Sequence, residues 1–232
     1  MLKFTQFFTE VTKTISYSKL KKDLKAFERE ISKKDVARAN IVKLLNQSLR
    51  SYDVTINQEN NQMIPSNQIF VSALFDPELD EDGEPSIELT LLFNAKDKKL
   101  TMEPEHVKEA VDSIIKAMMH EYIHRMQYQK RDYVYGREFK SDNKDKKYYG
   151  NTDEVEAFAN NIAQELLDQS NGNAQKAKGL LRNFERTSSR RSTSGNLLSP
   201  DFHNYVKYFG TSSPTIKRLV KRIYYYLENI ED

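Results

Sequence analysis

The stretch His120-Glu121-Tyr122-Ile123-His124 decides how this chain is interpreted. Residues four apart lie on the same side of an α-helix, one turn above the other, so both histidines can bind one metal ion. Imidazole nitrogens bind zinc at about 2.0–2.1 Å, and the glutamate after the first histidine lies beside the ion, near a zinc-bound water. The motif therefore predicts zinc ligands at His120 and His124 and a general base at Glu121.

The residues before and around the motif predict strands followed by a long helix. Alternating apolar residues predict strands at 52–56, 69–73 and 87–93 and a short strand at 100–102. Pro104 is suited to the first turn of a helix, and apolar residues recur at helical spacing from there to Met126. A motif of this kind, on a helix that follows strands, is typical of zinc peptidases.

The remaining segments are mostly helical in their pattern. Apolar stripes predict helices within residues 4–15, 20–31 and 36–49. Further helices are expected from about 152 to 169, after Asn173 and from Ser213-Pro214 onward, whereas 131–147 predicts a polar connection and 187–199 a loop.

A catalytic zinc site needs a third protein ligand and an open position for water. The chain has no cysteine, and no third histidine follows the motif at ligand spacing, so a carboxylate from the next helix is expected. Three acids lie at its start: Asp153, Glu154 and Glu156. We favour Glu156, because Ala159 three residues on allows close helix packing and Asn160 four residues on can hydrogen-bond a zinc-bound imidazole. Glu154 is the alternative, while Asp153 is better explained as complementing the helix dipole.

These residues together resemble the gluzincin metallopeptidases. Residues 156–167 are similar to the E-x-x-A-N-x-F/I-A-x-x-L-L pattern of ImmA/IrrE-type peptidases. Residues 149–159 are similar to the anthrax lethal factor catalytic domain, where Tyr-Gly precedes a T-x-E-x-E-x-F-A stretch. The resemblance covers roughly residues 68 to 168, and Ile123 departs from the glycine often found before the second histidine. It implies Glu156 as a ligand, and it implies that Tyr149 lies near the zinc and hydrogen-bonds the oxyanion.

Pattern and resemblance together predict an α+β fold with a zincin-like core. We expect a small twisted sheet, mixed or antiparallel, an active-site helix and a ligand helix, with extra helices at both ends of the chain. The expected regions are an N-terminal helical region at 1–50, the catalytic core at 51–170, and a mostly helical region at 171–232 that packs on the core.

The expected function is that of a zinc metalloendopeptidase, a gluzincin-like hydrolase with Zn²⁺ as its cofactor. Zinc-activated water attacks the peptide bond, and Glu121 acts as the general base. A protein or peptide substrate is expected to add as a strand to the edge of 87–93 or 100–102. His203 is a rival to Tyr149 as the electrophile, whereas His106 lies about 21 Å along the helix from His120, outside the site.

Charge and composition leave one alternative class of function. The chain has 36 basic and 34 acidic residues, a formal charge of +2, with basic residues gathered in the C-terminal third next to Tyr224, Tyr225 and Tyr226. The alternative is therefore a basic nucleic-acid- or protein-binding or assembly protein in which the zinc site is structural or incidental. Nucleic acid is not favoured as a partner, because charge runs are usually solvated faces. Short apolar runs and the polar residues of the N-terminus predict a cytoplasmic protein with no membrane segment.

Overall fold

The computed structural model describes residues 16–77, 86–131, 140–188 and 198–229 of the 232-residue chain. The apolar stripe expected at 4–15 and most of the loop expected at 187–199 lie outside the described residues. The chain divides into two compact units, Lys13–Met126 and a second that includes Gln127–Asp232. We call them the sheet unit and the helical unit. Their border falls inside helix α5 (Pro104–Lys130), so the last turn of α5 belongs to the helical unit.

The sheet unit contains a mixed sheet, within the range of sheet types that the sequence predicts. Its strand order is β2 (Val54–Asn60), β4 (Ser86–Phe93), β3 (Ile69–Asp76), in which β4 runs parallel to β2 and antiparallel to β3. Alternate side chains of a strand point to opposite faces, so β4 buries one complete row: Ile87, Leu89, Leu91 and Phe93. A second, two-stranded sheet pairs β1 (Val36–Ala37) with β5 (Lys99–Leu100).

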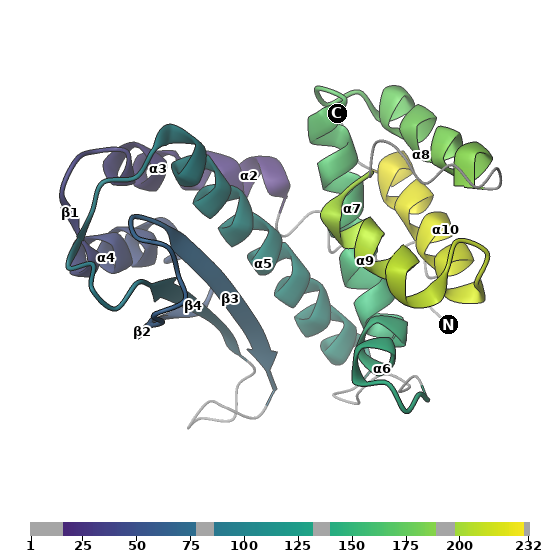
Figure 1. The fold of residues 1–232 in the computed structure, drawn as a ribbon, viewed down its shortest axis with the longest axis horizontal. Helices are drawn as coiled ribbons and strands as arrows, with labels where there is room; N and C mark the ends of the chain where they lie inside the picture. Colours follow the sequence, from purple (N-terminus) through teal and green to yellow (C-terminus); the bar gives the residue numbers. More distant parts are fainter. Residues whose placement is uncertain (1–15, 78–85, 132–139, 189–197, 230–232) are drawn as a thin grey trace. The chain divides into compact units, whose positions relative to one another are not determined.

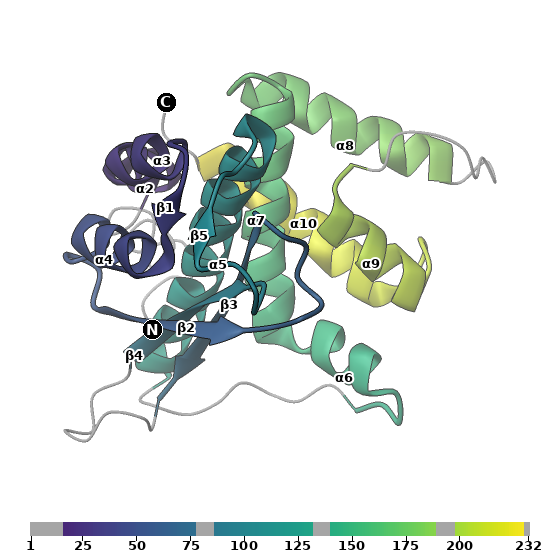
Figure 2. The same cartoon turned by 60° about the vertical axis from the view of Figure 1, so that its left-hand side comes forward.

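Helices complete the sheet unit, and they agree with the predicted apolar stripes except that the stripe at 20–31 is divided into two helices and Val36–Ala37 form strand β1. Before the sheet come α2 (Tyr17–Asp23), α3 (Lys25–Ile31) and α4 (Arg38–Ser48). Ser16 caps the N-terminus of α2, because its hydroxyl accepts a hydrogen bond from the Lys19 N–H. Helix α5 confirms the long helix expected from Pro104, and it lies beside β3 in both Figure 1 and Figure 2. This arrangement places residues of the motif next to an edge of the sheet.

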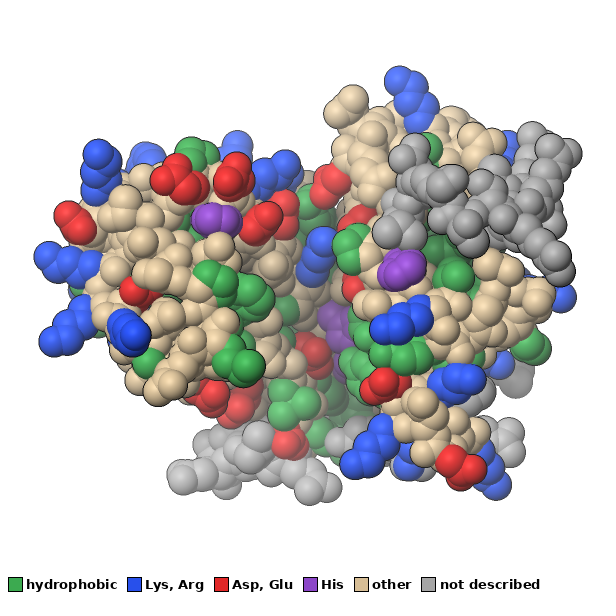
Figure 3. All heavy atoms as spheres, in the orientation of Figure 1, with side chains coloured by type: hydrophobic (Ala, Val, Ile, Leu, Met, Phe, Trp, Pro, Cys, Tyr) green, Lys and Arg blue, Asp and Glu red, His purple; other side chains and the backbone are tan. Residues whose placement is uncertain are grey.

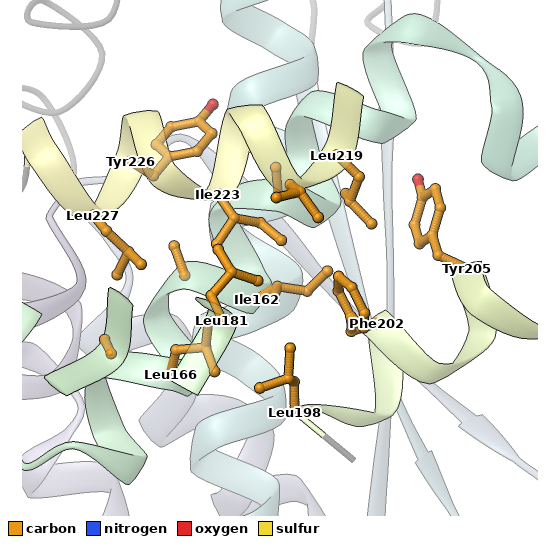
Figure 4. Close-up of a cluster of buried hydrophobic side chains, with 14 of the residues drawn as sticks. Ile162, Leu166, Leu181, Leu198, Phe202, Tyr205, Leu219, Ile223, Tyr226 and Leu227 are labelled. Carbon is orange, nitrogen blue, oxygen red and sulfur yellow. The ribbon is translucent and has the colours of Figure 1, made fainter. Parts of the chain in front are cut away.

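The helical unit consists of α6 (Lys144–Gly150), α7 (Thr152–Gln169), α8 (Ala174–Ser188), α9 (Pro200–Phe209) and α10 (Pro214–Asn229), together with the end of α5. Helix α7 packs against α10, and their buried side chains meet those of α8 and α9. Figure 4 shows this cluster, with Ile162 and Leu166 of α7 facing Leu181, Phe202 and Ile223. No helix in the described part of the chain is long and apolar enough to cross a membrane.

Two short helices differ from the sequence prediction. Helix α6 lies partly within the segment 131–147, which was expected to be a polar connection, and α9 was not expected as a separate helix. Both have an N-cap side chain: Asn143 accepts from the Lys146 N–H, and Ser199 accepts from the Phe202 N–H. These caps stabilise the first turns of the two short helices.

Candidate metal centre

Helix α5 brings the two imidazoles of the motif together. The Nε2 atoms of His120 and His124 are 3.1 Å apart, and their rings meet edge to face with centroids 4.7 Å apart. Two nitrogens bound to one tetrahedral zinc ion would be about 3.3 Å apart, given bonds of about 2.05 Å. His120 is 7% exposed and His124 is half-buried. The pair is therefore close to the separation that two ligands of one ion require.

Glu121, between the two histidines, is held by the sheet. Its Oε2 atom accepts a hydrogen bond of 2.8 Å from the backbone N–H of Phe75 in β3. Backbone groups of successive strand residues point to opposite edges, so this bond shows that the N–H of Phe75 faces away from β4. The carboxylate of Glu121 consequently lies at the outer edge of β3.

Among the residues that the structure describes, one group of side chains could hold a metal ion, and it consists of His120, His124 and Glu154. Each residue offers one ligand atom, and the three atoms lie within 4.8 Å of one another. Two imidazoles and one carboxylate form a donor set that zinc uses in catalytic sites, where the fourth position stays open for water or substrate. Imidazole also suits copper, iron and nickel, so the donor set fits zinc without being specific for it.

The first turn of α7, which carries Glu154, is anchored by its neighbour Asp153. The guanidinium of Arg131 donates two hydrogen bonds to the Asp153 carboxylate, and this contact raises the pKa of Arg131. The side-chain amide of Gln127, in the last turn of α5, donates to the Asp153 carbonyl at 3.4 Å, and Asn151 caps α7 by accepting from the Asp153 N–H at 3.0 Å. These contacts attach the start of α7 to the end of the helix that carries the histidines. The pairing with Arg131 is a role of Asp153 that the sequence pattern does not show.

Glu156, the ligand that the sequence favours, lies in a different environment. It is two residues from Glu154, about 200° around the helix, so the two carboxylates point to nearly opposite sides of α7. Glu156 is 4% exposed, and one of its oxygens pairs with the guanidinium of Arg222 in α10. Burial raises its pKa to about 7, against the opposing effect of Arg222. The group that could hold a metal ion contains Glu154, whereas Glu156 as a zinc ligand stays a prediction.

The buried Glu156–Arg222 pair predicts a pH-dependent effect on stability. The pKa of Glu156 is about 7 in the folded protein and near 4.5 in the unfolded chain. The folded state therefore binds a proton more tightly at this carboxyl than the unfolded state does. The stabilisation that this proton contributes is lost as pH rises from about 5 to 7. Arg222→Met removes the cation that favours the charged form and raises this pKa further. We expect the substitution to cost about 1–2 kcal/mol more at pH 8 than at pH 5.5.

Urea unfolding of metal-free protein at the two pH values measures this difference. In a Glu156→Gln background the Arg222→Met effect should become independent of pH, because the titrating carboxyl is gone. If Arg222→Met lowers the free energy of unfolding equally at both pH values while Glu156 is present, Glu156 is not the carboxyl whose pKa Arg222 lowers.

Asn160, the residue expected to support a zinc-bound imidazole, shares its side of α7 with Glu156. It is 5% exposed, and it lies about 40° around the helix from Glu156. The hydrogen bond from Asn160 to an imidazole stays a prediction.

Tyr149, the expected oxyanion donor, belongs to an aromatic cluster of the helical unit. Its ring stacks on Tyr208 at 5.1 Å between centroids and meets the rings of Tyr205 and Phe158. Burial raises the pKa of Tyr149, so its hydroxyl keeps the proton at neutral pH and can donate a hydrogen bond. Its contact with a substrate stays a prediction.

Two other histidines were considered in the sequence, and the role of His203 as electrophile stays a prediction. His203 is an exposed residue in the first turn of α9. The Nε2 of His106, near the start of α5, is 3.1 Å from the side-chain amide nitrogen of Gln68. His106 therefore lies beside Gln68, the residue before strand β3, and not beside the histidines of the motif.

The strands expected to bind substrate also need correction. Strand β4 (residues 86–93) pairs on both sides, with β2 and with β3, so it has no free edge. Strand β5 is only two residues long and pairs with β1. Strand β3 has β4 as its one strand partner within the described residues, and its outer edge is the one that holds Glu121. Sequence periodicity identifies the strands but not their order, so this edge could not be found before the pairing was known.

Comparisons with known proteins give no relative: no family model, no curated protein and no solved structure matches this chain.

Proposed function

We propose that this protein is a zinc-dependent peptidase in which His120, His124 and Glu154 hold the zinc ion and Glu121 is the general base. The observation that carries the proposal is the grouping of two imidazole nitrogens of α5 with one carboxylate oxygen of α7, together with Glu121, which lies next to His120 in the sequence of α5. A structural zinc site usually has four protein ligands, whereas three leave a position for substrate or water. The three-ligand group thus supports catalysis over a purely structural role.

The residues of the chain have distinct tasks in this proposal. Bound zinc would supply Lewis acidity, which polarises a scissile carbonyl and lowers the pKa of a water ligand. Glu121 accepts a proton from the attacking water and delivers it to the leaving amine. The hydrogen bond from Phe75 orients the Glu121 carboxylate before substrate binds. Tyr149 remains our candidate for a hydrogen bond to the developing oxyanion.

We place the substrate backbone along the outer edge of β3. Because the N–H of Phe75 faces this edge, the N–H and C=O groups of Ala73 and Val71 face it too. An extended peptide can pair with these groups as an added strand. Phe70 and Leu74 lie on the solvent-exposed face of β3, where their side chains are 47% and 53% exposed. Figure 3 shows hydrophobic side chains (green) on this part of the sheet unit. They supply apolar contact next to the proposed backbone pairing.

Proline substitutions on β3 test this placement. Ala73→Pro removes an N–H at the outer edge, so kcat/KM for peptide cleavage should fall about tenfold, the value of one hydrogen bond of about 1.4 kcal/mol. Its melting temperature should change little, because proline is tolerated at strand edges. Ser72→Pro is the matched control: it removes an N–H that faces β4, and it should destabilise the fold by about 3 kcal/mol. Unchanged cleavage by Ala73→Pro would remove β3 as the binding strand.

The proposed function is tested by measuring zinc content and hydrolysis on the same preparation. Protein purified without a histidine tag should contain about one zinc per chain. It should cleave unstructured protein substrates, and a chelator should stop the cleavage until zinc is restored. Stoichiometric zinc without cleavage of any peptide in a broad library would favour the alternative in which the zinc is structural.

A further inference from the structure

A pocket of about 650 Å³ lies between α8 and α10, entirely within the helical unit. Its volume is in the range of about 300–1,000 Å³ that ligand sites occupy. The lining residues come from α8, from the turn before α10 and from α10 itself. None of them belongs to the metal-binding group, so the pocket is a separate feature.

Helix α10 lines this pocket with two parallel rows of side chains. Ile216, Val220 and Tyr224 follow each other at intervals of four residues, which places them in one row about 12 Å long. Lys217 and Lys221 form the neighbouring row. Phe184 of α8 faces them across the pocket. The pocket is therefore a groove with an apolar floor and with Lys217 and Lys221 along one side, and its lining also includes Glu228. We call it the α8–α10 groove.

The charge around the α8–α10 groove is strongly positive. The sequences of α8, α9 and α10 contain nine Lys and Arg residues and three Asp and Glu residues, a net charge of +6 in a chain whose total is +2. Lys178 pairs with Glu228 at 3.7 Å. Lys217 and Lys221 are exposed, and neither forms an ion pair within the described residues. Two cations beside the apolar floor are thus available to an acidic ligand.

We infer that the α8–α10 groove binds an acidic amphipathic helix of a partner protein. Such a helix would lay its apolar side on Ile216, Val220 and Tyr224 and direct carboxylates at Lys217 and Lys221. An apolar floor with only two cations beside it fits this ligand better than nucleic acid, which requires cations for several successive phosphates. The inference goes beyond the proposed function, because it requires neither metal nor hydrolysis.

Two designed peptides test the inference. The probe is a fluorescein-labelled helix of about 18 residues, with leucines spaced four apart and glutamates flanking them, and its counterpart has lysine at each glutamate position. Fluorescence anisotropy with full-length Glu121→Gln protein avoids cleavage during the titration. The acidic peptide should bind saturably, and the basic peptide should bind at least about tenfold more weakly.

Variants then locate the binding. Lys217→Glu with Lys221→Glu should reverse the preference, so that the basic peptide binds more tightly than the acidic one. Lys176→Glu with Lys207→Glu changes the net charge equally at exposed positions that do not line the groove, and it should leave the acidic peptide within about threefold of its original affinity. Tyr224→Ala tests the floor, and about tenfold weaker binding is expected with unchanged circular dichroism.

Several results would overturn the inference. One is the absence of saturable binding of the acidic peptide, and another is an equal loss in the two charge-reversal pairs. A third is tighter binding of a labelled oligo(dT), lost with Lys217→Glu and Lys221→Glu, which would assign the α8–α10 groove to nucleic acid. A dimer in sedimentation that the same pair dissolves would assign it to a second copy of this chain.

Discussion

Glu121→Gln should lower kcat/KM for peptide cleavage by about 10³-fold, within the 10²–10⁴-fold range for loss of a general base. Glutamine has nearly the same shape, and its side-chain oxygen can still accept the hydrogen bond from the Phe75 N–H that Glu121 accepts. It cannot take a proton from water. The zinc content should stay near that of the wild type, because Glu121 is outside the metal-binding group. Kinetics and elemental analysis of the same sample measure both quantities.

Glu109→Gln is the matched control for this experiment. Glu109 is an exposed residue of the same helix, so its replacement should leave both cleavage and zinc content unchanged. If Glu121→Gln cleaves peptides within about threefold of the wild-type rate, the general-base assignment and the proposed mechanism fail together.

Glu154→Gln should weaken zinc binding by at least about 100-fold. Loss of a residue that only hydrogen-bonds a metal ligand already lowers metal affinity by about 10–100-fold, and loss of a ligand itself should lower it at least as much. Glu156→Gln makes the same chemical change two residues away, and it should keep zinc affinity within about tenfold, because the Glu156 carboxylate pairs with Arg222. Competition with a chromophoric chelator measures both affinities. The comparison is sharp because the two substitutions alter charge equally within one helix.

The reverse outcome has an equally clear meaning. If zinc affinity is lost in Glu156→Gln and kept in Glu154→Gln, Glu156 is the ligand that the gluzincin resemblance implies, and the assignment of Glu154 fails. His120→Ala should lose zinc in either case, because both assignments share the two histidines of α5.

Local periodicity in the sequence determined most of the elements. The spacing of apolar residues predicted α5, α7 and α10, because a helix that buries one face must repeat about every 3.6 residues. The alternation in β4 likewise predicted a strand with one buried row. The approach of His120 to His124 is also local, because residues four apart on a helix always lie on one side.

Contacts between residues far apart in the sequence determined which side the two glutamates of α7 face and the order of the strands. Glu154 and Glu156 both lie in the first turns of α7, and the rotation of that helix determines which side each carboxylate faces. This rotation depends on Arg131 and Arg222, which contact α7 from elements that precede and follow it. Strand order was equally non-local: β3, and not β4, has the edge that contacts Glu121. Such choices depend on side-chain pairing and burial between segments far apart in the chain, which no local pattern encodes.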